Sequence, residues 1–349
     1  MSIHIRKKHL VFFSVYVVLS LAWMGNRVQS QSSNLIPPGA TFEFLFERTA
    51  PLVGGLTEGP AVAPDGSIYF TDIPQSGGTG MILRFDPQTK NTTVFAEDSR
   101  MANGLIFDTK GRLWACEGAN KGGQAIVWWD VKKKERHVVS DRFGDKRFNS
   151  PNDLCLDKKG QVYFTDPRYV GDEPIELEHR SVYRVDTGGK VEIITSDVTQ
   201  PNGIAISHDG KSLYVANTDR GDETRAASMK VYVFSLDGNG KVTGPRRTLI
   251  NFGKETGCDG MCLDEEGRIY LAIRETTRPG ILVLSPEGRE LAFLATANKT
   301  LPSNVEFGIS DDRNVLYTTI GTGLFRVRLN SVGPIRKFQS RPSNGSQQP

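Results

Sequence analysis

The sequence predicts an all-β fold, a six-bladed β-propeller with four-stranded blades, because three observations agree. Short alternating segments recur around glycine turns, as in EGPAVAPDGSIYFTD and NDLCLDKKGQVYFTD. A second hairpin follows each of these segments, so each unit holds four strands. No long segment carries apolar residues at helical spacing. Four short strands repeated six times are typical of a propeller, in which each blade buries its faces against its neighbours.

The turns set the period of the repeat. Successive turns are 45 to 57 residues apart, and their glycines are Gly66, Gly111, Gly160, Gly210 and Gly267. A sixth copy has Arg313 at the turn, and LFRVRLNSVGPIRKF follows it as the expected last hairpin. A two-sheet sandwich also uses short alternating strands, but it does not need a period. We also predict that the leading segment TFEFLFER adds an outer strand to the last blade and closes the ring.

The first thirty residues differ from the rest in charge and hydropathy. Three bases, Arg6 to Lys8, precede an apolar run from Leu10 to Met24, which is shorter than the roughly 20 residues that a bilayer span needs. We predict a signal peptide over residues 1–30, the propeller domain over 31–338 and a flexible tail over 339–349. A retained N-terminal anchor is the alternative. The mature chain is then expected to be secreted or periplasmic, monomeric and without a membrane span.

Charge and cysteine content exclude several functions. Without residues 1–30, 39 bases face 40 acids, so the mature chain is near neutral and no nucleic-acid partner is expected. Four cysteines are too few for a disulfide scaffold of 349 residues, and we expect at least Cys155 and Cys262 to pack in the core. The absence of a GxSxG motif argues against a serine nucleophile.

One register of the repeat carries side-chain oxygens in five blades. Counting back eight residues from each turn glycine reaches the axial set, defined as Glu58, Asn103, Asn152, Asn202 and Asp259. The sixth copy gives Val305 at this position. Because the innermost strands of a propeller surround its axis, we expect the axial set to line one mouth of a central channel. The alternative is a local role, since Asn-Gly and Asp-Gly are common turn dipeptides.

The chemistry of the axial set predicts a hard cation. Two carboxylates and three carboxamides, without thiolate or imidazole, favour Ca²⁺, and Mg²⁺, Mn²⁺ or Zn²⁺ are the alternative divalent ions. Asn103 is expected to contact substrate or water rather than the ion. A second polar set stands six or seven residues after the turns and comprises Asp72, Glu117, Asp166 and Asn217. These residues are predicted to form a shell beside the axial set, unless they simply end strands in solvent.

Four segments carry a family resemblance: EGPAVAPDGSIYFTD, SPNDLCLDKKGQVYFTDP, PNGIAISHDGKSLYVANTD and CDGMCLDEEGRIYLA. Together they resemble the gluconolactonase and regucalcin-like (senescence marker protein) family of calcium-dependent lactonases over about residues 40–335. The resemblance implies a divalent cation in the channel and hydrolysis of a small-molecule sugar lactone. It implies Glu58, Asn202 and Asp259 as metal ligands, and Asn152 as either a ligand or a residue that orients substrate.

We therefore expect a metal-dependent hydrolase in which the cation polarises the lactone carbonyl and Asp259 acts as general base or proton shuttle. The expected substrate-binding residues are Asn103, Glu117, Asn152 and Arg168. Arg168 lies in TDPRYVG, where many relatives have TDPPYG, and it is expected either to bind an anionic substrate or to pair with Asp172 or Glu173. The alternatives are an organophosphate or aryl ester hydrolase, and a non-catalytic calcium-stabilised propeller that binds a partner on its rim.

Overall fold

The computed structural model describes residues 34–47, 55–74, 78–224 and 226–339 of the 349-residue chain. The predicted signal peptide and residues 340–349 of the predicted tail lie outside this range. Among the described residues, no helix has the length and hydropathy needed to cross a membrane.

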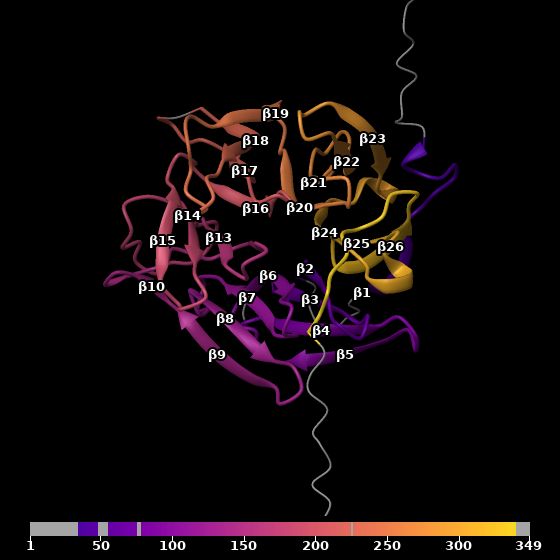
Figure 1. The fold of residues 1–349 in the computed structure, drawn as a ribbon, viewed down its shortest axis with the longest axis horizontal. Helices are drawn as coiled ribbons and strands as arrows, with labels where there is room; N and C mark the ends of the chain where they lie inside the picture. Colours follow the sequence, from indigo (N-terminus) through magenta and orange to yellow (C-terminus); the bar gives the residue numbers. More distant parts are fainter. Residues whose placement is uncertain (1–33, 48–54, 75–77, 225, 340–349) are drawn as a thin grey trace, which may run out of the picture.

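Six four-stranded antiparallel sheets surround a common axis, which confirms the predicted six-bladed propeller (Figure 1). From the axis outward, the first two blades contain β2 (Leu56–Val62), β3 (Ile68–Ile73), β4 (Met81–Asp86) and β5 (Asn91–Ala96), then β6 (Ala102–Phe107), β7 (Leu113–Glu117), β8 (Ala125–Asp130) and β9 (Glu135–Ser140). The next two contain β12 (Leu154–Leu156), β13 (Val162–Asp166), β14 (Ser181–Val185) and β15 (Val191–Thr195), then β16 (Pro201–Ile206), β17 (Ser212–Asp219), β18 (Ser228–Ser235) and β19 (Arg247–Gly253). The fifth contains β20 (Cys258–Leu263), β21 (Ile269–Ile273), β22 (Gly280–Leu284) and β23 (Glu290–Ala295), and a small hairpin, β10 (Arg142–Phe143) with β11 (Lys146–Arg147), lies between the second and third blades in sequence.

The sixth blade joins the two ends of the propeller. Its strands are β24 (Pro302–Phe307), β25 (Val315–Ile320), β26 (Gly323–Arg328) and, outermost, β1 (Glu43–Glu47). Strand β1 pairs antiparallel with β26, and Arg326 binds the Glu43 carboxylate through Nε at 2.8 Å and Nη2 at 3.1 Å. The prediction that TFEFLFER closes the ring is therefore confirmed.

The predicted last hairpin is wrong in its second half. Residues 329–338 form no strand, because β1 already occupies the outer edge of β26 and Pro334 has no N–H group to donate to a ladder. The segment instead contacts the turns between the two innermost strands of the fifth and sixth blades. The carbonyl of Val332 accepts the Glu265 N–H at 2.8 Å, and Gly333 N–H donates to the carbonyl of Arg313 at 2.7 Å.

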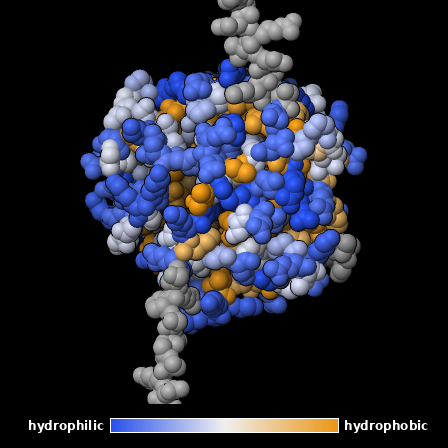
Figure 2. Space-filling model, turned by 45° about the vertical axis from the view of Figure 1, so that its right-hand side comes forward, coloured by the Kyte–Doolittle hydropathy of each residue, from blue (hydrophilic) through white to orange (hydrophobic). Residues whose placement is uncertain are grey.

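Apolar and aromatic side chains fill the spaces between blades. Tyr69 contacts Phe95 and Phe107 edge-to-face, with ring centroids 5.2 Å apart in both pairs, so the first blade packs on the second. The four cysteines are buried and free, and Cys155 and Cys262 belong to apolar clusters as predicted. The face in Figure 2 is mostly hydrophilic, with hydrophobic residues in small separate groups.

The innermost strands contact one another in a closed order around the axis: β2, β6, β12, β16, β20, β24 and again β2. A glycine follows four residues of the axial set, and each glycine lies against the next blade. A Cβ atom would overlap Asn103 O from Gly59, the Asp153 side chain from Gly104, Asp259 O from Gly203 and the Asn304 side chain from Gly260. Glycine is needed at these positions because neighbouring strands approach closely at the axis.

We predict that Gly203→Ala lowers the free energy of unfolding by at least about 2 kcal/mol, because the new methyl group meets the backbone of Asp259 rather than a flexible side chain. Urea denaturation measures the difference. Gly238→Ala is the matched control, since a Cβ atom there meets nothing within 4 Å and no left-handed φ is involved. Its stability should change by less than about 0.5 kcal/mol. Equal effects of the two substitutions would contradict the close-approach argument.

Candidate functional site

The axial set lies at the start of five innermost strands. Glu58, Asn103, Asn202 and Asp259 are within β2, β6, β16 and β20, and Asn152 lies two residues before β12. The alternative of a local turn role is therefore wrong for the Asn-Gly and Asp-Gly dipeptides, which are in strands. Their glycines allow contact between blades instead.

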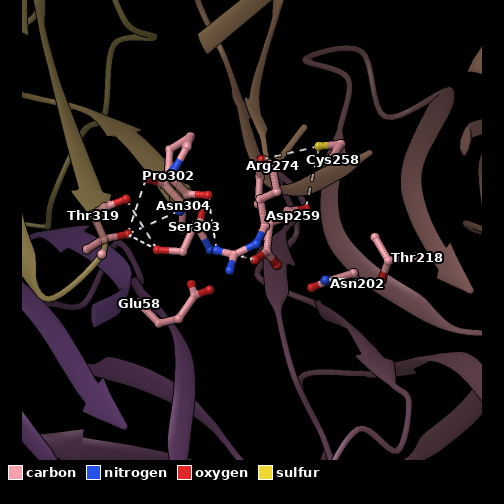
Figure 3. Close-up of polar contacts among 12 residues, drawn as sticks. Glu58, Asn202, Thr218, Cys258, Asp259, Arg274, Pro302, Ser303, Asn304 and Thr319 are labelled. Carbon is pink, nitrogen blue, oxygen red and sulfur yellow. Dashed lines mark hydrogen bonds and ion pairs between the residues drawn. The ribbon is translucent and has the colours of Figure 1, made fainter. Parts of the chain in front are cut away.

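Three members of the axial set point into one space at the end of the channel where the innermost strands begin. We call this end the upper mouth. Figure 3 shows the side chains of Glu58, Asn202 and Asp259 converging from three different blades. The Asn202 Nδ2 group donates to Thr218 Oγ1 at 3.3 Å, and the amide also acts to lower the pKa of Asp259. The Asn202 Oδ1 atom makes no hydrogen bond to a described residue, so an oxygen acceptor is free to bind a ligand.

The carboxylates at this mouth disfavour one another's charge. Burial raises the pKa of Glu58 well above its usual range, and the nearby Asp259 and Asp153 raise it further. Burial also raises the pKa of Asp259, against the opposing effects of Arg274 and Asn202. The site therefore concentrates negative charge that a bound cation would stabilise.

Two further channel residues were missed by the register of the repeat. Asp153 is buried, and its carboxylate accepts the Leu154 N–H at 2.9 Å and the Asn304 Nδ2–H at 3.3 Å. Burial raises the pKa of Asp153 to about 7. Asn304 is the counterpart of Asp153 in the sixth blade, because its N–H donates to Thr319 Oγ1 and its Oδ1 accepts the next N–H, as Asp153 does with Thr165 and Leu154.

The sixth register failed because its turn is longer. Seven residues, 308–314, separate β24 from β25, whereas five residues, 63–67, separate β2 from β3. Counting back a fixed number from Arg313 therefore reaches Val305, which packs in the apolar core, instead of Ser303, the residue before Asn304. The missed signal was the Ser-Asn pair just before the apolar alternation of the last copy.

The second polar set is buried, which contradicts the alternative that its members end strands in solvent. Two of them hold the backbone that leads into an axial residue. The Asp166 carboxylate accepts the N–H groups of Asn149 and Ser150 at 2.9 and 2.7 Å, ahead of Asn152. Asn217 Oδ1 accepts the N–H groups of Thr199 and Gln200 at 2.9 and 3.0 Å, ahead of Asn202.

Two expected substrate contacts are placed differently. Glu117 has no exposed surface, and its carboxylate forms a two-pronged ion pair with Arg136 of β9 at 2.5 and 2.6 Å. It is therefore unavailable to a substrate in the channel. Arg168 holds the loop that follows β13: it donates to the carbonyls of Asn149 and Glu173 and forms an ion pair with the Glu173 carboxylate at 3.4 Å. Of the two expectations for Arg168, the structure favours pairing with Glu173.

The donor chemistry fits a hard divalent cation. In the described ranges no group of three or more His, Cys, Asp or Glu side chains is arranged to hold a metal ion, so a cation here would also need amide oxygens. Glu58 and Asp259 supply two negative charges, and Asn202 supplies a free amide oxygen beside them. Oxygen donors of this kind are the ligands of calcium and magnesium.

A cavity of about 810 Å³ opens at the other end of the channel. Turn residues and the segment Pro334–Gln339 line it, and no member of the axial set does. Asp153 and Asn304 line its inner end, so these two residues separate the cavity from the upper mouth.

Fold and site together define a six-bladed propeller with a polar, negatively charged site on its axis. The sequence matches the family model described as SMP-30/Gluconolactonase/LRE-like region over residues 56–322. It is 33% identical over 304 residues to the gluconolactonase of Zymomonas mobilis, covering 79% of each chain. It is 27% identical over 269 residues to the pentonolactonase XacC of Haloferax volcanii, covering 76% of this chain and 82% of the relative. The chain belongs to the SMP-30/gluconolactonase/LRE-like family.

Solved structures agree on the fold. A gluconolactonase from Xanthomonas campestris superimposes with a TM-score of 0.71 at 25% identity, covering 85% of this chain and 91% of its own. The calcium-binding protein regucalcin from Agrobacterium tumefaciens gives a TM-score of 0.67 at 20% identity, covering 86% and 98%. The second likeness supports the fold alone.

We predict that Asp166 makes stability depend on pH. Burial raises its pKa from 3.8 to about 7, so the folded state binds this proton more tightly than the unfolded state. The contribution is fully present below about pH 4 and is lost as the pH rises through about 7, with a magnitude on the order of 4 kcal/mol. Urea denaturation at pH 4.5 and 7.5 should show a wild-type advantage over Asp166→Asn that is larger at the lower pH.

Asp237→Asn is the control for this experiment. Asp237 is half-buried at the surface and also accepts two backbone N–H groups, from Asn239 and Lys241, which lower its pKa. Its contribution should therefore have the opposite dependence, present at higher pH and lost on acidification. If the stability of wild type relative to Asp166→Asn grew with pH, the folded state would stabilise the ionised form of Asp166, and the prediction would be wrong.

Proposed function

We propose that this protein is a lactone hydrolase that depends on a divalent cation, calcium before magnesium, manganese or zinc. The observation that carries the proposal is the convergence of Glu58, Asn202 and Asp259 on one space at the upper mouth. The lactonase names of the relatives from Zymomonas mobilis and Haloferax volcanii support the reaction class. The substrate would be a small sugar lactone.

Glu58, Asn202 and Asp259 would hold the cation, and Asn152, which is half-buried on the neighbouring blade, would complete the donor set. When bound, the cation supplies a Lewis acid for the ester carbonyl. Asp259 is proposed as the base that accepts a proton from the attacking water. Coordination to the cation would weaken the basicity of Asp259, so most of the activation would come from the cation.

The half-buried amides of Asn103 and Asn152 are proposed to recognise substrate hydroxyl groups. Neither side chain makes a hydrogen bond to another residue of the described ranges, although both stand at the upper mouth. An amide that both donates and accepts is suited to the hydroxyl groups of a sugar ring. Asn152 can bind both the cation and the substrate, because its Oδ1 atom can coordinate the cation while its Nδ2 group donates to a substrate hydroxyl.

The first test is hydrolysis of five- and six-membered aldonolactones, followed by the release of acid. Treatment with a chelator should reduce the rate at least about 100-fold, because the carbonyl loses its Lewis acid, and calcium should restore it. An aryl ester and a phosphotriester in the same panel test the other hydrolase classes. A protein that binds calcium but hydrolyses none of these compounds would contradict the proposal and favour a binding propeller.

The second test separates the two carboxylates. Asp259→Asn should lower kcat on the best lactone by about 100-fold or more at saturating calcium, because the base is lost. Glu58→Gln should weaken calcium binding by about 10-fold or more, measured by calorimetry, with kcat recovering at high calcium. Glu290→Gln is the control, since Glu290 lies on the outer strand β23 and pairs with Arg278 at the surface. Full activity of Asp259→Asn would eliminate the base role.

A further inference from the structure

Arg274 places a positive charge inside this acidic site. It follows β21, and its backbone N–H donates to the carbonyl of Gly257 at 2.8 Å, next to the start of β20. Its Nη1 atom lies 3.3 Å from Asp259 Oδ2 and donates to the carbonyl of Pro302 at 3.2 Å. Figure 3 shows the guanidinium group between the carboxylates of Glu58 and Asp259. The side chain is 22% exposed, so the group reaches the upper mouth.

Much of the hydrogen-bonding capacity of Arg274 is unused. A guanidinium group has five N–H donors. In the described part of the chain, its Nε and Nη2 atoms donate to no protein group, and neither is among the fully buried polar atoms. Arg168 differs, because it donates to backbone carbonyls and pairs with Glu173. Arg274 is thus a fixed cation with donors directed to solvent at the site.

The contacts of Arg274 point to an anionic ligand. Glu58 and Asp259, the carboxylates on either side of the guanidinium group, are both proposed ligands of the divalent cation. Arg274 would then share its single carboxylate partner with that cation. Asp153 is hydrogen-bonded to Leu154 and Asn304 and is not a contact of Arg274. A guanidinium that shares its ion-paired carboxylate with a cation keeps donors for a further anion, and its planar fork matches a carboxylate.

We propose that Arg274 determines specificity by binding a carboxylate group of the ligand. The inference rests on the proposed lactone hydrolysis for its choice of ligand. Two sources of that group exist. The lactone can carry a carboxylate of its own, or the reaction can create one: water adds to the ester carbonyl, the ring C–O bond breaks, the ring oxygen takes a proton as a hydroxyl, and the new acid releases a proton to become a carboxylate.

The experiment compares Arg274→Gln with wild type on two lactones. One is a neutral six-carbon aldonolactone, and the other differs from it only by a terminal carboxylate in place of the CH₂OH group. If the substrate carries the anion, the kcat/KM of wild type should favour the anionic lactone, and Arg274→Gln should lower that value about 10- to 100-fold more than the value for the neutral lactone. If the product carries it, the inhibition constant of the ring-opened hydroxy acid should rise by a similar factor.

Two variants control the experiment. Arg274→Lys keeps the charge but loses the fork, so it should recover part of the lost carboxylate binding. Arg278→Gln makes the same change four residues along the same loop, where the side chain pairs with Glu290 at the surface, and it should change neither constant. Thermal unfolding of Arg274→Gln checks that the fold is retained.

Calorimetric titration of the calcium-loaded protein with the hydroxy acid separates this inference from the proposed function. Carboxylate binding that weakens in Arg274→Gln would support the role of Arg274 even if wild type hydrolysed no lactone, and the proposed function alone would then fail. Conversely, a wild type that hydrolyses lactones while Arg274→Gln keeps the same preference, product inhibition and titration would overturn the inference.

Discussion

Close approach of six strands at one axis is the constraint on which the rest of the structure depends. The glycines after the axial residues lie so near the next blade that no side chain fits, and this contact fixes the distance between blades. It also brings together side chains from residues 58, 202 and 259, which are distant in the chain. Acids placed this way raise one another's pKa, so the local arrangement is unfavourable and persists because ring closure leaves it no alternative.

The outer polar residues explain how the axial side chains keep their directions. Asp166 and Asn217 each bind two consecutive backbone N–H groups two or three residues ahead of an axial asparagine. Holding this backbone fixes where the Cα–Cβ bonds of Asn152 and Asn202 point, and the hydrogen bond to Thr218 then orients the Asn202 amide. A site built from loop-entry segments therefore gains rigidity from buried hydrogen bonds rather than from regular strand pairing.

The fold was predictable because it is periodic. Glycine turns fixed the unit length, and hydrophobic alternation fixed which residues face the core, so five axial positions followed from counting. The same counting gave the outer set its correct place but left open whether its members are buried, because exposure depends on neighbours that the period does not describe. Glu117 shows this: its partner Arg136 comes from the outermost strand of the blade, where charged residues ordinarily face solvent.

Residues outside the period could not be found in this way. Asp153 and Asn304 both stand one position beyond the axial register, and the longer turn also displaced the count in the sixth copy. Arg274 lies in the loop 274–279, whose sequence has no counterpart in other blades, and only the three-dimensional course of its side chain brings the guanidinium group back to Asp259. Arg168, by contrast, closely follows a repeated Thr-Asp pair and was easily noticed, yet it holds a loop. Periodicity therefore predicts the shared scaffold of the axial site, whereas the residue that distinguishes this chain's ligand is supplied by an irregular loop.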